Sequence, residues 1–184
     1  MFARTKRLTL RPGWPEDAAA LTRAVAHEEV AMKLSRLPWP YTEAHAADWL
    51  AMDRARDDVL CLIFAHEAPT PHLIGSIGIH PGDEGGHEIG YWLTPEAWGR
   101  GYATEAGRAM LGIARHALGL KRLTSGYFVD NPASGNVLSK LGFRKTGRIV
   151  PQFSLARGRE VDCVKLERDL SDDEAPTPRM PIAA

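Results

Sequence analysis

A short glycine-containing turn carries the residues with the clearest chemical potential. It consists of Trp98, Gly99, Arg100, Gly101, Tyr102 and Ala103, and it leads into an amphipathic segment. No Ser, Thr, Asp or Asn stands directly before Tyr102, so the first N–H groups of the expected helix lack a side-chain partner. Glycine lets the backbone approach a ligand closely, and a helix N-terminus favours negative charge. The turn is therefore typical of a phosphate-binding loop.

Three other interpretations of this turn are weaker. A P-loop requires Gly-Lys followed by Ser or Thr at the helix start, and this turn contains no lysine. A dinucleotide fingerprint requires a third glycine where Thr104 stands and an acidic residue about twenty positions later, where the chain reads Lys121-Arg122-Leu123. An ordinary surface turn would explain the glycines but not the uncapped helix.

Two regular elements must position this turn. Residues 88–93 are short and rich in aromatic side chains, and glycines precede them while Thr94 and Pro95 follow, which predicts a strand. Residues 103–118 carry apolar side chains at steps of three and four, which predicts an amphipathic helix of about four turns. Gly119 stands where a left-handed C-terminal cap is needed.

Together with a later motif, the turn resembles the GCN5-related N-acetyltransferase (GNAT) family. The later motif is Asn131-Pro132-Ala133-Ser134, followed by Lys140-Leu141-Gly142-Phe143. Trp98 replaces the Gln or Arg of the general family pattern, and in this the chain looks like the RimJ/RimL branch. The resemblance implies an α/β fold with a mixed, mostly antiparallel sheet of six to seven strands and about four helices packed on both faces.

The resemblance also implies that the loop holds the pyrophosphate of acetyl-coenzyme A. The implied cofactor-binding residues are Leu93, Trp98, Gly99, Arg100, Gly101, Tyr102, Ala103, Thr104, Asn131 and Asn136. Among them, the backbone N–H near Leu93 is the implied donor to the oxyanion. Asn131 and Asn136 would contact the pantetheine arm or the strand above it.

Acetyl transfer from a thioester to an amine needs a neutral amine and a proton for the departing thiolate. Glu88 is the best-placed carboxylate to act as the base, directly or through water, and a structural ion pair is the alternative role. His80 and His87 are the fallback bases. Many family members use a tyrosine as the acid at the position of Leu138, whereas the RimJ/RimL branch implies Ser134. A helix cap is the alternative role for Ser134.

The acceptor side of the cleft is expected near the N-terminus. Helices are predicted over 15–26 and 42–56, with Thr42 as the cap of the second, and prolines interrupt the segment between them. The resemblance implies that Trp39 and Tyr41 in this segment line the substrate pocket. The alternative is that both aromatic side chains pack the segment onto the core.

The remaining pattern completes one domain over 1–170, followed by a tail over 171–184 that is expected to be disordered. Strands 59–66, 72–80 and 88–93 should form an antiparallel meander, and a crossover should place 122–129 parallel to the last of them. The other expected elements are strands 8–11, 143–151 and 160–166 and a helix over 133–141.

Composition excludes several classes of partner. The chain has 23 Lys plus Arg residues and 23 Asp plus Glu residues, so its formal net charge is zero. It therefore has no overall positive charge that would attract nucleic acid or an anionic membrane. No apolar segment is long enough for a bilayer and no signal peptide is visible, which predicts a cytoplasmic protein. The seven histidines lack metal-ligand spacing, so no metal is expected. Cys61 and Cys163 should be buried free thiols.

The sequence thus predicts an acetyl-coenzyme A-dependent N-acetyltransferase that works by direct attack in a ternary complex. The acceptor is either the N-terminal amine of a protein or peptide or the amine of a small molecule. The alternative function is a non-catalytic acyl-coenzyme A-binding module that senses or regulates. Whether the protein forms a homodimer is left open.

Overall fold

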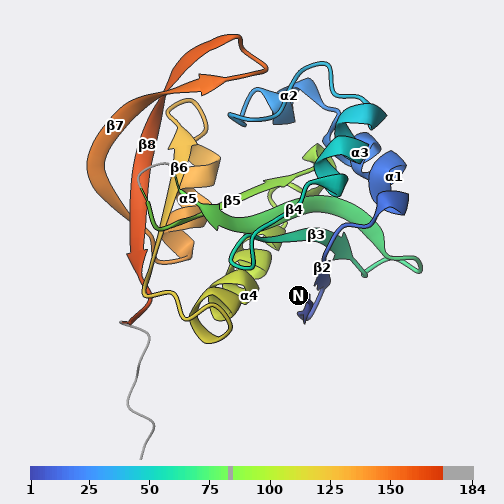
Figure 1. Cartoon of the computed structure of the whole chain (residues 1–184), viewed down its shortest axis with the longest axis horizontal. Coiled ribbons are helices and arrows are strands. Elements are labelled where there is room, and N and C mark those ends of the chain that lie inside the picture. The colour runs from blue at the N-terminus through green and yellow to red at the C-terminus, as the bar shows by residue number, and fades with distance from the viewer. Residues whose placement is uncertain (83–84, 172–184) are drawn as a thin grey trace, which may run out of the picture.

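The computed structural model describes residues 1–82 and 85–171, and an eight-stranded sheet lies at its centre (Figure 1). The strand order is β1-β2-β3-β4-β5-β6-β8-β7. Neighbouring strands are antiparallel except β5 and β6, which are parallel, as the crossover predicts. The strands are Ala3–Arg4 (β1), Leu8–Arg11 (β2), Val59–Ala65 (β3), His72–Pro81 (β4), His87–Leu93 (β5), Arg122–Phe128 (β6), Arg144–Ser154 (β7) and Arg159–Asp169 (β8).

Helices cover both faces of this sheet. Figure 1 shows α1 and α3 on one side and α4 on the other. The α-helices in the described residues are Ala18–Val25 (α1), Glu28–Ala31 (α2), Glu43–Ala51 (α3), Tyr102–His116 (α4) and Pro132–Lys140 (α5). None of them is long and apolar enough to cross a membrane. The expected mixed sheet, mostly antiparallel and with helices on both faces, is confirmed.

The expected numbers of elements are slightly wrong. The described part of the chain has eight strands rather than six or seven, and five α-helices rather than four. The additional strand, β1, has two residues and is too short to show an alternating pattern. The additional helix, α2, is a single turn that follows α1 closely. Of the tail expected to be disordered, only Ser171 lies within the described residues.

The helix expected over 42–56 begins as predicted but ends earlier. The Thr42 hydroxyl caps α3 by accepting a hydrogen bond from the His45 N–H at 3.4 Å. The helix ends at Ala51, and the Arg54 guanidinium then donates to the carbonyl groups of Trp49 and Met52, at 2.7 and 3.1 Å. Arg54 thereby satisfies two carbonyl groups at the helix end instead of continuing the helix.

Two apolar layers hold the sheet between its helices. Ile63 faces the larger cluster, shared with α4, while its neighbour Leu62 faces a smaller one with Leu21 of α1 and Ala46 of α3. This alternation follows from the two-residue period of a strand. Cys61 and Cys163 are buried free thiols, as predicted, and burial raises the pKa of each.

The hairpin of β7 and β8 reaches back to the N-terminal half of the chain. Its tip arches toward α2 in Figure 1. The Leu155 N–H donates to the Ser35 carbonyl at 2.9 Å, and Arg157 pairs with Asp130 at 2.6 Å while donating to the Met32 carbonyl at 2.8 Å. These bonds fix the segment after α2 against the C-terminal strands.

An ion pair at the end of β2 provides a test of fold stability. Arg11 donates two hydrogen bonds of 2.7 Å to the buried Asp17 carboxylate, which also accepts the Trp14 N–H at 2.8 Å. The bonds from Arg11 lower the pKa of Asp17 even though burial acts in the opposite direction. The folded state therefore gains stability from the ionised carboxylate above its unfolded pKa, and loses it as the pH falls through the folded pKa.

We expect Asp17→Asn to lower the free energy of unfolding by about 2 to 3 kcal/mol at pH 7, because it leaves Arg11 without its carboxylate. Urea denaturation at pH 7 and near pH 3 measures the effect. The difference from wild type should shrink at the lower pH, where the native carboxylate becomes protonated too. Asp48→Asn, on an exposed part of α3, is the control. Equal midpoints for Asp17→Asn and wild type at pH 7 would contradict the prediction.

Candidate functional site

The start of α4 is uncapped, as the sequence predicts. Gly101 is the N-cap residue with a left-handed φ of 80°, and no side chain caps the helix. The first hydrogen bond of the helix runs from the Glu105 N–H to the Gly101 carbonyl at 3.1 Å. The N–H groups of Tyr102, Ala103 and Thr104 therefore have no partner within the helix. Three adjacent donors at a positive helix end form a ready anion site.

A carboxylate network ties this loop to the N-terminus of the chain. Glu105 accepts hydrogen bonds from the Thr5 hydroxyl at 2.6 Å, the Arg7 N–H at 2.9 Å and the Arg7 Nε at 2.7 Å. Arg7 also donates to the Arg100 carbonyl at 3.0 Å. Burial acts to raise the pKa of Glu105, but the bonds from Thr5 and Arg7 outweigh it and lower the pKa. Sequence reasoning missed this network, since about one hundred residues separate its partners.

The side chain of Tyr102 anchors the loop instead of facing a ligand. It is buried, its hydroxyl donates to Glu67, and the guanidinium groups of Arg7 and Arg100 lie 4.5 and 5.0 Å from its ring centre. Ala103 and Thr104 are buried as well. Of the predicted cofactor-binding residues, these three therefore offer their backbone N–H groups, whereas Trp98 and Arg100 have exposed side chains.

The parallel strands β5 and β6 are joined near their starts and separate beyond. Glu88 is paired with Thr124, whose hydroxyl donates to the His87 carbonyl at 3.1 Å. The Ser125 hydroxyl donates to the Ile89 carbonyl at 2.9 Å. Beyond these contacts, toward the C-terminal ends of β5 (residues 87–93) and β6 (residues 122–128), the two strands form no further backbone pairs. A gap between the ends of the two strands therefore opens where the loop that leads to α4 leaves β5.

The backbone of Leu93 faces this gap. The Thr94 N–H donates to the Ile74 carbonyl of the neighbouring chain segment at 2.8 Å, and Leu93 is opposite Gly75. Because hydrogen-bonded and non-hydrogen-bonded pairs alternate between antiparallel strands, the N–H and C=O of Leu93 point away from β4 and toward β6. The Leu93 C=O accepts the Trp98 indole N–H at 2.8 Å.

Trp98 connects the loop to two other elements. Besides its hydrogen bond to β5, its ring lies 3.7 Å from the Lys33 Nζ, in the segment after α2. This cation–π contact joins the predicted acceptor side to the loop. The indole therefore has a structural role in addition to the cofactor contact that the family resemblance implies.

Two hydroxyl groups meet on the α4 face of the gap. The Tyr91 hydroxyl donates to Ser134 Oγ at 3.1 Å, which links β5 to the first turn of α5. Burial raises the pKa of Tyr91, although the bond to Ser134 acts in the opposite direction. Asn131, and not Ser134, is the N-cap residue of α5. Sequence reasoning missed Tyr91. The available signal was its position two residues from both Ile89 and Leu93, which places it on the same, buried face of the strand.

Glu88 lies on the opposite face of β5. Its Oε2 is 3.9 Å from the Lys165 Nζ, which also donates to Gln152 Oε1 at 3.2 Å. The Glu88 side chain is 23% exposed, so it remains accessible to a ligand despite this pair. The structure thus contains the ion pair that the sequence left as an alternative, and the role of Glu88 as a base stays a prediction.

The fallback histidines differ in their surroundings. His80 is opposite Glu88 in the β4–β5 register, and its Nδ1 lies 3.0 Å from the Pro81 carbonyl. His87 Nε2 is hydrogen-bonded to Asp57 at 2.9 Å, which lowers the pKa of that carboxylate. Within the residues that the structure describes, no three His, Cys, Asp or Glu side chains are grouped as metal ligands.

The two aromatic residues predicted to bind the acceptor are placed differently. Tyr41 packs on the smaller apolar cluster together with Trp92 of β5, and burial raises its pKa to about 12. Trp92 and Glu88 share one face of β5, so Tyr41 lies on the side of the sheet that carries Glu88. Trp39 is exposed, as is the predicted cofactor contact Asn136 on α5. Their contacts with ligands stay predictions.

Comparisons with known proteins show which family the sequence matches. The family model described as "Acetyltransferase (GNAT) domain" matches residues 7–144. The uncharacterized N-acetyltransferase p20 of Bacillus licheniformis is 30% identical over 162 residues, which cover 86% of this chain and 90% of p20. The uncharacterized N-acetyltransferase YoaA of Bacillus subtilis is 38% identical over 95 residues, which span about half of each chain, 50% and 53%.

Solved structures share the fold. An acetyltransferase of the GNAT family from Bacillus anthracis superposes with a TM-score of 0.77 and 21% identity, covering 93% of this chain and 99% of that one. RimL, a ribosomal L7/L12 alpha-N-protein acetyltransferase in complex with coenzyme A, gives a TM-score of 0.76 and 18% identity, covering 94% of this chain and all (100%) of that one. At these identities the likeness concerns the fold alone.

Proposed function

The chain belongs to the GNAT acetyltransferase family, and we propose that it transfers an acetyl group from acetyl-coenzyme A to a primary amine. One observation carries this proposal: the loop that ends in the uncapped start of α4 is hydrogen-bonded, through Trp98, to the backbone of β5 at its gap with β6. The helix start can bind a pyrophosphate, and the unpaired backbone groups of the strand can bind amide groups. A ligand that carries a pyrophosphate and an amide-containing arm fits both features.

The residues at the gap fit this ligand. The N–H groups of Tyr102, Ala103 and Thr104 would hold the pyrophosphate, and glycine at 99 and 101 keeps side chains away from it. The Leu93 N–H would donate to the carbonyl oxygen where negative charge develops. Acetyl-coenzyme A supplies the thioester that is cleaved.

Proton acceptor and proton donor lie on opposite faces of the sheet. Glu88 is on the face that α1 and α3 cover, where it would take a proton from the amine, directly or through water. Ser134, hydrogen-bonded to Tyr91, is on the α4 face and would give a proton to the thiolate. The gap between β5 and β6 joins the two faces. This arrangement favours direct attack in a ternary complex, with the amine and the cofactor entering from different sides.

We further propose that the chain is RimJ/RimL-like, on the strength of Trp98 and Ser134 and of the fold shared with RimL. The acceptor would then be an N-terminal amine of a protein or peptide, or a small-molecule amine. A thiol-release assay with peptide N-termini, polyamines and aminoglycosides tests this. Release with any of them supports an enzyme, whereas cofactor binding without release across the screen favours the non-catalytic sensor.

Cofactor binding should be visible as thermal stabilisation. Acetyl-coenzyme A at about a hundred times its Kd should add about 2.7 kcal/mol to the free energy of unfolding and raise Tm by roughly 5 to 10 °C. Desulfo-coenzyme A should act similarly, because the loop is expected to hold the pyrophosphate and not the thiol. Acetate alone should have no effect. An unchanged Tm at saturating cofactor would contradict the proposed function.

Gly101→Val should weaken coenzyme A binding by about tenfold or more, because a β-branched residue is strained at φ 80° and displaces the N–H groups that follow. Gly119→Val is the matched control. Gly119 has a φ of 65° at the other end of the same helical segment. Valine at this position therefore introduces similar backbone strain, but far from the loop. Both variants should lose stability, and only Gly101→Val should lose affinity in isothermal titration. Equal affinities would contradict the loop assignment.

A further inference from the structure

The three strands at the middle of the sheet contain four glycines. They are Gly75 and Gly78 in β4, Gly90 in β5 and Gly126 in β6. Glycine is unfavourable inside a strand, because its backbone loses more freedom on folding than that of any other residue and it has no side chain to pack. It often marks a point where another group approaches the backbone closely. Each of these glycines therefore needs a physical reason.

Close packing against neighbouring strands explains three of the four. A Cβ added at Gly75 would collide with a backbone carbonyl of β5. A Cβ added at Gly78 would lie 3.0 Å from Leu60 Cδ1, which is tighter than ordinary van der Waals contact. A Cβ added at Gly126 would lie 2.8 Å from Cys163 Sγ. At these three positions the neighbouring atoms already fill the space that a side chain would need.

Gly90 has no such reason. Apart from its neighbours in the chain, the described residues place one atom within 4 Å of an added Cβ, His80 Nε2 at 3.9 Å. Gly90 is only partly buried, although β5 lies between β4 and β6 in the sheet. Its φ is not in the left-handed region, so the backbone conformation does not require glycine either. The space above Gly90 is therefore open to a ligand.

Two hydrogen-bond acceptors border this space. Glu88, Gly90 and Trp92 share one face of β5, and His80 lies opposite Glu88 in the β4–β5 register. His80 Nδ1 is 3.0 Å from the Pro81 carbonyl oxygen, which can only accept. Nδ1 therefore carries the hydrogen of this bond, and Nε2 of the neutral ring is an acceptor. A carboxylate and an imidazole nitrogen beside one open space suit a group that donates several hydrogen bonds.

We propose that the space above Gly90 receives the acceptor amine and that Gly90 determines which amines fit, an inference that rests on the proposed function. The amino group would donate hydrogen bonds to Glu88 and to His80 Nε2, and the carbon that carries it would lie over Gly90. A floor without a side chain is needed only by a substituent that extends toward the sheet. The favoured acceptor is therefore a primary amine on a branched carbon.

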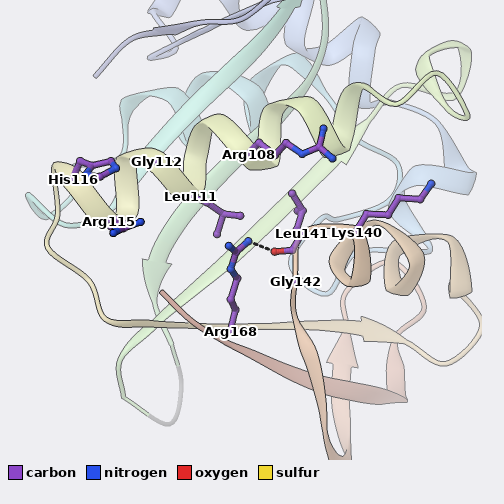
Figure 2. Close-up of a pocket in the computed structure, with 9 residues that line it drawn as sticks. All are labelled: Arg108, Leu111, Gly112, Arg115, His116, Lys140, Leu141, Gly142 and Arg168. Carbon is purple, nitrogen blue, oxygen red and sulfur yellow. Dashed lines mark hydrogen bonds between the residues drawn. The ribbon is translucent and has the colours of Figure 1, made fainter. Parts of the chain in front are cut away.

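The test adds small side chains at Gly90, as Gly90→Ala and Gly90→Val. Gly112→Ala is the matched control, because a Cβ added at Gly112 also meets no atom within 4 Å. Gly112 lies on α4, where it lines a hollow between α4 and α5 (Figure 2). Steady-state kinetics use an amine that releases thiol in the screen and the same amine methylated on the carbon next to the nitrogen. Isothermal titration measures coenzyme A affinity, and Tm reports folding.

We expect Gly90→Ala to raise the KM for the amine and to lower kcat/KM by about tenfold or more, and Gly90→Val to lower it further. The loss should be larger for the methylated amine. Coenzyme A affinity should be unchanged, and the Tm of Gly90→Ala should not fall, because alanine meets no atom there and restricts the unfolded chain. A merely structural role would give the opposite result, a lower Tm with unchanged KM. Gly112→Ala should match the wild type in both kinetic constants.

Failure of this proposal and failure of the proposed function give different results. Wild-type kcat/KM in both Gly90 variants would overturn the proposal and leave the acetyltransferase function standing. If no amine in the screen causes thiol release from the wild type, the proposed function fails. The same amines are then titrated into isotope-labelled wild-type protein. A shift of the Gly90 amide resonance in the NMR spectrum would retain the space as an amine-binding pocket, and an unmoved resonance with every amine would overturn it.

Discussion

Replacing Glu88 with glutamine is expected to lower kcat by about a hundredfold or more, the usual contribution of a general base. Glutamine keeps the shape and a hydrogen-bonding oxygen but cannot accept the amine proton. The affinity for coenzyme A should stay nearly unchanged, because Glu88 lies on the face of β5 opposite to Tyr91 and Ser134. Steady-state turnover together with cofactor titration measures both effects.

The pH dependence of this variant separates catalysis from packing. In the wild type, protonation of Glu88 should reduce kcat/KM on the acid side of the profile, and Glu88→Gln should lack that limb. Loss of the contact with Lys165 without a catalytic role would instead lower stability and leave the shape of the profile intact. Glu160→Gln, at an exposed position of β8, is the control. Turnover at the wild-type level would show that Glu88 is only a structural ion-pair partner.

Ser134→Ala is the second variant with a large expected effect. If its hydroxyl protonates the departing thiolate, turnover should fall by about a hundredfold without loss of cofactor affinity. If Ser134 serves only as the hydrogen-bond acceptor of Tyr91, the free energy of unfolding should fall by roughly 1 kcal/mol and turnover should persist. Ser139→Ala, exposed on the same helix, is the control for serine removal.

Tyr91→Phe decides which hydroxyl matters in this pair. Tyr91 donates to Ser134, so a proton given up by Ser134 can be replaced from Tyr91. If the two act as a unit, each single variant should lose about as much rate as the double variant, and the effects should not add. Additive losses would mean that the hydroxyls act independently. Wild-type rates in Ser134→Ala and Tyr91→Phe would mean that solvent supplies the proton.

The sequence by itself determined the features that depend on neighbouring residues. Gly101, with no capping side chain before Tyr102, predicts an uncapped helix start, and the structure has it. The apolar steps of 103–118 predict α4, and Gly119 follows it with a left-handed φ. The parallel relation of β5 and β6 follows from the helix between them. Each of these rests on chemistry within a few residues or on a general rule of chain connection.

Only the tertiary structure decided which distant side chains meet. The contacting pairs lie 43 to 100 residues apart in the sequence. They are Glu105 with Thr5 and Arg7, Tyr91 with Ser134, and Glu88 with Lys165. The gap beyond Ile89 likewise arises where separate elements come together. Such contacts depend on sheet order and on which face each strand presents, and a local pattern of residue types encodes neither the partner strand nor its register.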